Sequence, residues 1–294
     1  MSIDPAGRVV RSTASPHSET RRTAPIRTFL HAADGVTINS VYDPPASVYD
    51  ASAPPARSPV FVIAHGFTGD VDRPHVRRVA EAFTQYGAVV TFSFRGHGAS
   101  GGRSTVGDRE VLDLAAAVQW ARSLGHTRVA TVGFSMGGSV VLRHAALYRP
   151  DGSPDGPGRE GRTDAHSDAV VSVSAPARWY YRGTAPMRRV HWLITRPEGR
   201  LVGRYGLRTR IHHREWDPVP LSPVEAVPRI APTPLLIVHG DRDGYFPLDH
   251  PRMLATAAGE HAELWMEPGM GHAEHAASED LLARIGDWAV GGGG

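Results

Sequence analysis

The chain has 294 residues, of which 41% are hydrophobic and 21% are charged, a composition typical of globular domains rather than disordered or fibrous chains. Its formal net charge of +2 excludes binding of polyanions through overall charge alone. The absence of cysteine excludes disulfides, thiolate nucleophiles and cysteine-based metal sites. The N-terminus lacks an apolar signal segment and no apolar run is long enough to span a bilayer, so we expect a cytoplasmic protein.

The composition along the chain predicts one folded domain with disordered ends. Residues 1–25 are rich in Ser, Thr, Arg and Pro and contain few large apolar side chains, which predicts a disordered leader. Residues 26–290 carry the apolar patterning of a single domain, with an insertion at about residues 178–230. The glycines of residues 291–294 predict a flexible tail.

The predicted elements alternate between strands and helices. Residues 27–42 predict two short strands around a turn at residues 33–35. Continuous apolar runs predict buried strands at residues 60–64, 88–94, 128–132, 168–174, 234–239 and 262–266. Helical spacing of apolar residues predicts helices at 75–86, 106–123, 136–148, 247–258 and 279–289. This alternation predicts an α/β fold with a doubly wound, mostly parallel sheet.

A nucleophile motif lies directly after one predicted strand and directly before a helix. Residues 133–137 read Gly-Phe-Ser-Met-Gly and fit the pattern G-x-S-x-G. So tight a turn strains the backbone at the serine and needs small residues at both ends. The turn raises the Ser135 hydroxyl above the sheet, facing the free N–H groups and the positive dipole end of the helix. The context therefore indicates Ser135 as a nucleophile.

A serine hydroxyl needs a general base, and the chain supplies an acid and a histidine downstream in the order that this motif requires. Gly-Asp-Arg-Asp at residues 240–243 follows one predicted strand, and Gly-Met-Gly-His at residues 269–272 follows the next. Both segments lie at the carboxyl ends of strands, where open parallel sheets bind ligands. We therefore expect Ser135 and His272 to form a triad with Asp243 or Asp241.

Together with His-Gly-Phe at residues 65–67, these motifs resemble the α/β-hydrolase fold family, specifically its esterase and lipase-like members. The resemblance extends from about residue 60 to the C-terminus. It implies an α/β-hydrolase fold with a small lid in the insertion, Ser135 as nucleophile and His272 as base. Asp243, the last residue of the HGxxD pattern, would be the acid. The backbone N–H groups of Phe67 and Met136 would form the oxyanion hole.

Several neighbouring polar residues receive structural roles. Asp241 is the competing acid, and we expect it to shape its turn by accepting backbone N–H groups. Asp70 and Glu274 are predicted to be solvated, and the Arg-Gly-His-Gly loop at residues 95–98 is predicted to be structural. No His, Asp and Glu residues have metal-ligand spacing along the chain, so no metal site is predicted. The cationic side chains are all arginine, which is typical of a GC-rich genome, such as that of an actinobacterium.

The insertion is strongly basic and aromatic. Between residues 178 and 214 it contains ten arginines and a single acid, Glu198. One interpretation is a solvated basic cap whose aromatic side chains pack on the domain. Another is a surface that attracts an anionic acyl substrate or an anionic membrane. Nucleic-acid binding is not expected, because no recognised binding module accompanies the arginines.

The sequence thus predicts an enzyme that hydrolyses a carboxylic ester through an acyl-enzyme, without a cofactor. A thioesterase, an amidase or peptidase, or an acyltransferase would use the same triad. A hydrolase-like binding protein without catalytic activity is a further alternative, although such proteins usually lack a triad member. The acyl chain, the leaving group and the oligomeric state remain open at this point.

Overall fold

The computed structural model describes residues 24–46, 59–150 and 163–292. The predicted leader, residues 1–25, lies almost wholly outside the described residues, as do the last two residues of the predicted tail. Among the described residues, no helix combines the length and the apolar character that crossing a bilayer requires.

The fold is built on one eight-stranded sheet in the order β1-β2-β4-β3-β5-β6-β7-β8. The strands are β1 (Ile26–His31), β2 (Thr37–Asp43), β3 (Val60–Ala64), β4 (Ala88–Phe92), β5 (Val129–Phe134), β6 (Ala169–Val173), β7 (Leu235–Gly240) and β8 (Ala262–Glu267). The β1–β2 and β2–β4 pairs are antiparallel, and all other pairs are parallel. The predicted mostly parallel α/β sheet is therefore confirmed.

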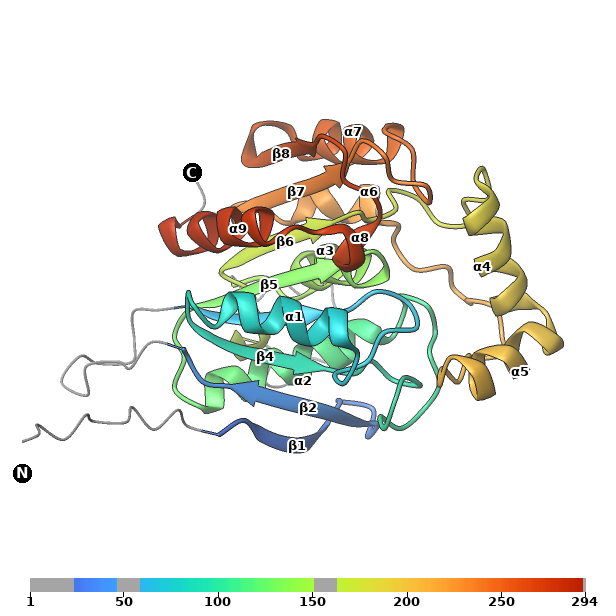
Figure 1. The fold of residues 1–294 in the computed structure, drawn as a ribbon, viewed down its shortest axis with the longest axis horizontal. Coiled ribbons are helices and arrows are strands. Elements are labelled where there is room, and N and C mark those ends of the chain that lie inside the picture. Colours follow the sequence, from blue (N-terminus) through green and yellow to red (C-terminus); the bar gives the residue numbers. More distant parts are fainter. Residues whose placement is uncertain (1–23, 47–58, 151–162, 293–294) are drawn as a thin grey trace, which may run out of the picture.

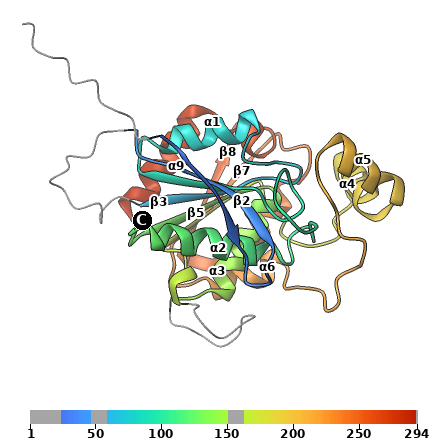
Figure 2. The ribbon, with the colours of Figure 1, turned by 90° about the horizontal axis from the view of Figure 1, so that it is seen from below.

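Helices cover both faces of the sheet (Figures 1 and 2). They are α1 (Pro74–Phe83), α2 (Glu110–Ser123), α3 (Met136–Leu147), α4 (Ala185–Thr195), α5 (Pro197–Gly206), α6 (Pro223–Ala226), α7 (Asp249–Ala258), α8 (Ala273–Ala276) and α9 (Glu279–Gly291). Helices α1 and α9 lie on one face, and α2, α3 and α6 on the other (Figure 2). Each face has its own apolar core cluster, one around Phe61 and Phe83 and one around Phe92 and Leu142.

The middle strands are apolar along their whole length because both of their faces are covered by helices. Every residue of β3, β4, β5, β6 and β7 is buried. Burial on both faces fixes the position of the strands, and their carboxyl ends therefore form a rigid edge. The loops that follow β3, β5, β7 and β8 all leave from this edge.

Some boundaries differ from the sequence prediction for local physical reasons. Helix α2 begins at Glu110, not at residue 106, because the Glu110 carboxylate accepts hydrogen bonds from the backbone N–H groups of Thr105, Val106 and Gly107. Helix α9 continues to Gly291, two residues beyond the predicted end, and stops where Gly292 adopts a left-handed conformation.

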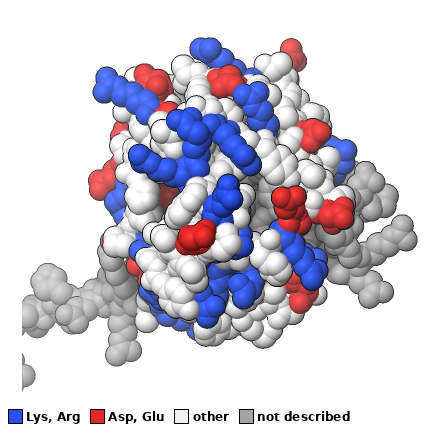
Figure 3. All heavy atoms as spheres, turned by 90° about the vertical axis from the view of Figure 1, so that its right-hand side faces the viewer, with Lys and Arg blue, Asp and Glu red and all other residues white. Residues whose placement is uncertain are grey.

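The insertion leaves the sheet between β6 and β7. Its helices α4 and α5 lie beyond the carboxyl ends of the parallel strands (Figure 1). Arginine side chains gather on the face of the molecule on which these helices lie (Figure 3). The insertion therefore lies over the edge of the sheet at which the sequence motifs converge.

Candidate active site

Ser135 occupies a sharp turn between β5 and α3. Its backbone φ is 52°, a left-handed value that is costly for a residue with a side chain. Its N–H donates to Val173 O at 2.9 Å, and its carbonyl accepts from Ser139 N at 3.1 Å. The turn is therefore held on the sheet side and on the helix side, and it presents the hydroxyl at the sheet edge.

The two glycines of the motif, Gly133 and Gly137, allow the turn to pack tightly against the start of α3 and against β3. A Cβ on Gly133 would lie 2.2 Å from Gly137 O, and a Cβ on Gly137 would lie 2.1 Å from Ala64 O. Both distances are far inside van der Waals contact, so each position requires glycine. The turn predicted from G-x-S-x-G thus has a direct steric basis.

Ser135, His272 and Asp243 form a hydrogen-bonded line. His272 Nε2 lies 2.9 Å from Ser135 Oγ, and His272 Nδ1 lies 2.8 Å from Asp243 Oδ2. The ring of Tyr245 stacks on the imidazole, with centroids 4.1 Å apart. One imidazole nitrogen therefore faces the hydroxyl while the other faces a carboxylate, the arrangement that a general base requires.

Asp243 is oriented by its own turn. Its Oδ1 accepts hydrogen bonds from Tyr245 N at 2.8 Å and Phe246 N at 3.1 Å, which leaves Oδ2 for His272. The side chain is fully buried. Burial raises the pKa of this carboxyl, but the hydrogen bonds from His272 and the two backbone groups outweigh it and leave the pKa below its usual value.

Asp241, the alternative acid, contacts a different part of the chain. Asp241 Oδ1 accepts a hydrogen bond from Gly269 N at 2.6 Å, and Asp241 is exposed. It ties the loop after β7 to the loop after β8. His239 is buried, and its Nε2 lies 2.9 Å from Phe246 O. Of the two acids, Asp243 is the one that contacts His272.

The loop after β3 faces Ser135 from the neighbouring strand. Phe67 and Met136 line the same cavity as Ser135. Within the part of the chain that the structure describes, the backbone N–H groups of Phe67 and Met136 have no hydrogen-bond acceptor. Two free N–H groups beside a nucleophile are suited to stabilising negative charge on a substrate oxygen.

A buried glutamate holds this loop in place. Glu274 was predicted to be solvated, but it is only 3% exposed, and its Oε1 accepts a hydrogen bond from Gly66 N at 3.0 Å. On the other side of the loop, His65 Nδ1 lies 2.7 Å from Gly66 O, and His65 Nε2 accepts from Phe94 N at 3.0 Å. Burial lowers the pKa of His65 to about 3, so the ring is neutral and can accept this bond.

Two further polar residues are buried. Asp70, predicted to be solvated, is 3% exposed and accepts a hydrogen bond from Asp72 N at 2.9 Å. Arg95 is buried and makes ion pairs of 2.7 Å with both Asp34 and Asp113. Arg95 thus stabilises its loop, as predicted, and it does not line the cavity at Ser135.

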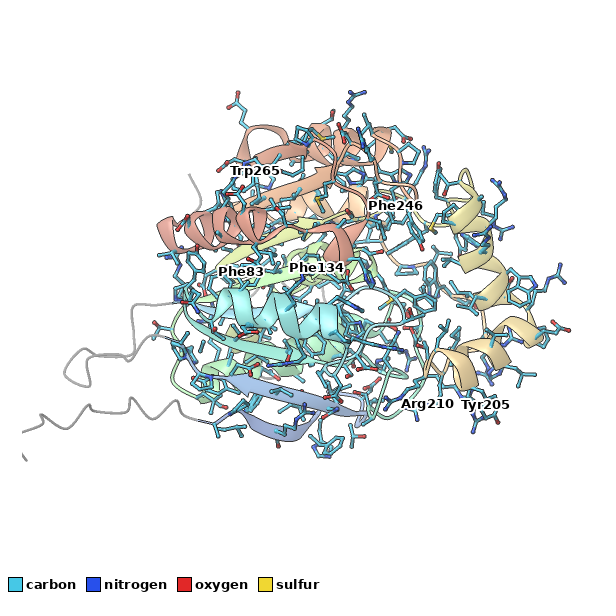
Figure 4. All side chains as sticks on the ribbon, viewed as in Figure 1. Phe83, Phe134, Tyr205, Arg210, Phe246 and Trp265 are labelled. Carbon is cyan, nitrogen blue, oxygen red and sulfur yellow. The ribbon has the colours of Figure 1, made fainter. Side chains whose placement is uncertain are left out.

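Ser135 and His272 line a cavity of about 340 Å³ between the sheet edge and the insertion. Most of its wall is apolar or aromatic and includes Phe67, Val106, Trp179, Tyr181, Met187, Val190, Leu193, Ile194, Leu207, Trp216 and Phe246. Phe246 lies on the side of the sheet that faces α4 (Figure 4). A cavity with such walls accommodates an apolar group attached to the carbon that Ser135 would attack.

A second cavity of about 290 Å³ adjoins the first, and the two share Val106, Tyr180, His191, Ile194 and Trp216. Its other lining residues include three arginines, Arg182, Arg200 and Arg214, and one acid, Glu215. Arg178 forms an ion pair with Asp249 at 3.0 Å. The structure gives the remaining arginines of the insertion no carboxylate partner among the described residues. With three arginines against one glutamate, the lining of the second cavity carries an excess of positive charge.

The chain matches the Alpha/beta hydrolase family over residues 61–285. It is 28% identical over 234 residues to a protein of Mycolicibacterium smegmatis named monoacylglycerol lipase, covering 72% of this chain and 80% of that relative. It resembles the esterase Pf2001 of Pyrococcus furiosus with a TM-score of 0.64, at 21% identity over 90% of this chain and 91% of the other. Est1E of Butyrivibrio proteoclasticus, solved with ferulic acid, has a TM-score of 0.55, at 21% identity over 90% and 97%.

Proposed function

Because this chain belongs to the alpha/beta hydrolase family, we propose that it is a serine hydrolase that cleaves a carboxylic ester through an acyl-enzyme. The observation that carries this proposal is the hydrogen-bonded line from Asp243 through His272 to Ser135 at the base of an apolar cavity. The strained backbone at Ser135 supports it, because such strain is found where function requires it.

The geometry supports a two-step mechanism. Ser135 Oγ attacks the ester carbonyl while His272 Nε2 accepts the hydroxyl proton. Asp243 holds the imidazole in the required tautomer and stabilises its positive charge. The negative charge on the carbonyl oxygen is stabilised by the N–H groups of Phe67 and Met136. His272 then protonates the departing alcohol. A water molecule, deprotonated by His272, attacks the acyl-enzyme, and His272 returns that proton to Ser135 Oγ as the acid is released.

The apolar cavity indicates the acyl group. Its aromatic and aliphatic walls fit a fatty acyl chain or an aromatic acid better than a polar one. One similar protein is named monoacylglycerol lipase, and another, Est1E, was solved with ferulic acid bound, so a lipid and an aromatic acid are the two apolar groups that these names mention. We therefore propose an ester with an apolar acyl group as the substrate.

A panel of p-nitrophenyl esters of increasing acyl length tests this function. We expect saturable hydrolysis by the wild type, an optimum above acetate, and no activity above background in Ser135→Ala. Matched thioester and amide substrates identify the preferred bond. Failure to hydrolyse any ester, or equal activity of Ser135→Ala, would refute the proposal.

We further propose that residues 178–230 form a lid whose second cavity binds an anionic part of the substrate. Arg182, Arg200 and Arg214 line that cavity, and the first cavity connects it to Ser135 through shared walls. Guanidinium groups bind carboxylate and phosphate well. Two esters that differ only in a neutral or a carboxylate-bearing leaving group test this. The anionic ester should have the lower KM, and added salt should reduce that advantage. Equal KM values at all salt concentrations would exclude it.

The outer side of the same insertion also carries exposed apolar groups, which would suit contact with a lipid surface. Trp192, Leu201 and Tyr205 are 47%, 57% and 74% exposed, and Tyr205 lies at the outer side of α5 (Figure 4). Co-sedimentation with vesicles of anionic and of neutral lipid tests this contact. Binding to anionic vesicles that Tyr205→Ala weakens would support it, and equal recovery without vesicles would exclude it.

A further inference from the structure

We infer that His75, Glu274 and His275 form a binding site for a zinc ion beside the active-site cavity. The three residues offer two imidazole nitrogens and a carboxylate oxygen, all within 4.8 Å of one another. None of the three takes part in the proton transfers proposed above. The inference therefore goes beyond the ester hydrolysis proposed for Ser135.

Two elements that are distant in the sequence bring these ligands together. His75 lies in the first turn of α1, whereas Glu274 and His275 belong to the short helix α8. Arg78, one turn after His75, donates hydrogen bonds of 2.8 Å to the backbone carbonyls of Glu274 and Ala277. These bonds fix α8 against α1, so the ligand positions are set by the fold rather than by a mobile loop.

The side chains are already close to ligating geometry. His75 Nε2 lies 3.8 Å from Glu274 Oε1, and the rings of His75 and His275 have centroids 3.8 Å apart. Zinc bonds of about 2.0–2.1 Å in a tetrahedron separate the ligand atoms by roughly 3.4 Å. Because the ligand atoms lie within 4.8 Å of one another, side-chain rotations that shorten their separations by up to about 1.4 Å would bring all three onto one ion.

The carboxylate has the character of a ligand. Glu274 is buried, and one of its oxygens accepts the hydrogen bond from Gly66 N. Its other oxygen has no hydrogen-bond donor in the described part of the chain. Oε1, the oxygen that faces His75, accepts only the bond from Gly66 N among the described residues, and a carboxylate oxygen can accept more than one partner. A buried carboxylate beside two imidazoles therefore gains from a cation. The two arginines near this site have other partners among the described residues. Arg73 forms an ion pair with Asp70 at 3.5 Å, and Arg78 donates to backbone carbonyls.

The donor set and the access of solvent identify the metal. Two nitrogens and one carboxylate oxygen suit Zn²⁺ or its transition-metal neighbours, whereas Mg²⁺ and Ca²⁺ prefer oxygen ligands alone. Glu274 and His275 line the cavity above Ser135, and His275 is exposed, so an ion and a fourth, water ligand can enter. A bound zinc would share the carboxylate that holds Gly66, which links the site to the loop carrying Phe67.

Isothermal titration of untagged, EDTA-treated protein with ZnCl2 tests the site without recourse to ester hydrolysis. We expect saturable binding of about one zinc per chain and no binding of MgCl2 or CaCl2 under the same conditions. His75→Ala and His275→Ala should each weaken zinc binding at least about tenfold, since each removes one of three protein ligands. His275 is exposed, so its substitution does not endanger folding.

His31→Ala is the matched control, because His31 is an exposed histidine in β1, outside the site. It should bind zinc as the wild type does. Zinc should also raise the thermal midpoint of the wild type and His31→Ala, but not that of His275→Ala. Absence of saturable binding, or equal zinc affinity in all four proteins, would overturn the inference. Because binding is the readout, a failure of ester hydrolysis would leave this result unaffected.

Discussion

Asp243→Asn should abolish most of the activity by reversing the tautomer of His272. Oδ1 of Asp243 is held by the N–H groups of Tyr245 and Phe246, so the oxygen of an asparagine would take that place. Its amide nitrogen would then occupy the place of Oδ2 and donate to His272 Nδ1, 2.8 Å away. Nε2 would carry the proton, and it could not accept one from Ser135.

A reversed tautomer predicts a loss in kcat of about 10³-fold to 10⁴-fold, which corresponds to about 4–5.5 kcal/mol of transition-state stabilisation. The assay is the hydrolysis of a p-nitrophenyl ester under saturation, with circular dichroism as the check on folding. KM should change little, because Asp243 does not line the cavity. The loss should persist across the working pH range, since no titration restores the carboxylate.

Asp241→Asn is the matched control, because the same change is made two residues away. Asp241 Oδ1 accepts from Gly269 N and does not contact His272. An asparagine oxygen can accept the same bond, so kcat should stay within about threefold of the wild type. The reasoning would be refuted if Asp243→Asn kept more than a tenth of the activity, or if Asp241→Asn lost as much.

Three further predictions concern buried polar side chains. Arg95→Met should lower the free energy of unfolding by about 3–5 kcal/mol in urea titrations, because it leaves Asp113 buried without its partner; a loss below about 1 kcal/mol would contradict this. His144 is fully buried in α3, and this burial lowers its pKa from 6.5 to about 3. Its contribution to stability is thus complete above pH 6.5 and is lost as the pH falls, by about 2 kcal/mol at pH 5. In His144→Leu the free energy of unfolding should therefore fall less between pH 7 and pH 5 than it does in the wild type. An equal fall in both proteins would contradict this prediction. Glu274→Ala should lower kcat about 10-fold to 100-fold by releasing Gly66, with folding checked by circular dichroism; wild-type kcat would show that the loop needs no such support.

The sheet could be predicted because its signals are local. Strands buried on both faces need continuous apolar runs, and the runs at β3 and β7 are visible without knowledge of any other part of the chain. The turn at Ser135 is also local, since its steric requirement falls on two glycines four residues apart. The preference for Asp243 over Asp241 came from resemblance, and the contact with His272 agrees with it.

What could not be predicted depends on contacts between distant segments. Glu274 lies in a short polar stretch that is typical of a solvated turn, and its hydrogen bond from Gly66 depends on the approach of the loop after β3. The contact of His75 with His275 of α8 could not be predicted either, because only the tertiary packing of α1 and α8 brings the two rings together. Helices α4 and α5 carried a local signal that the prediction left unused. Met187, Val190 and Ile194 of α4 have helical spacing, and prolines in the first turns, Pro186 and Pro197, are typical of helix starts.

The central claim is that Ser135 is the nucleophile of an acyl-enzyme. The most direct test is labelling with a fluorophosphonate probe, followed by mass spectrometry of the modified peptide. The wild type should carry one phosphonyl group, on Ser135, and prior incubation with an ester substrate should slow the labelling. Ser135→Ala should remain unlabelled under the same conditions. Labelling that persists in Ser135→Ala, or a modification that maps to another residue, would contradict the account.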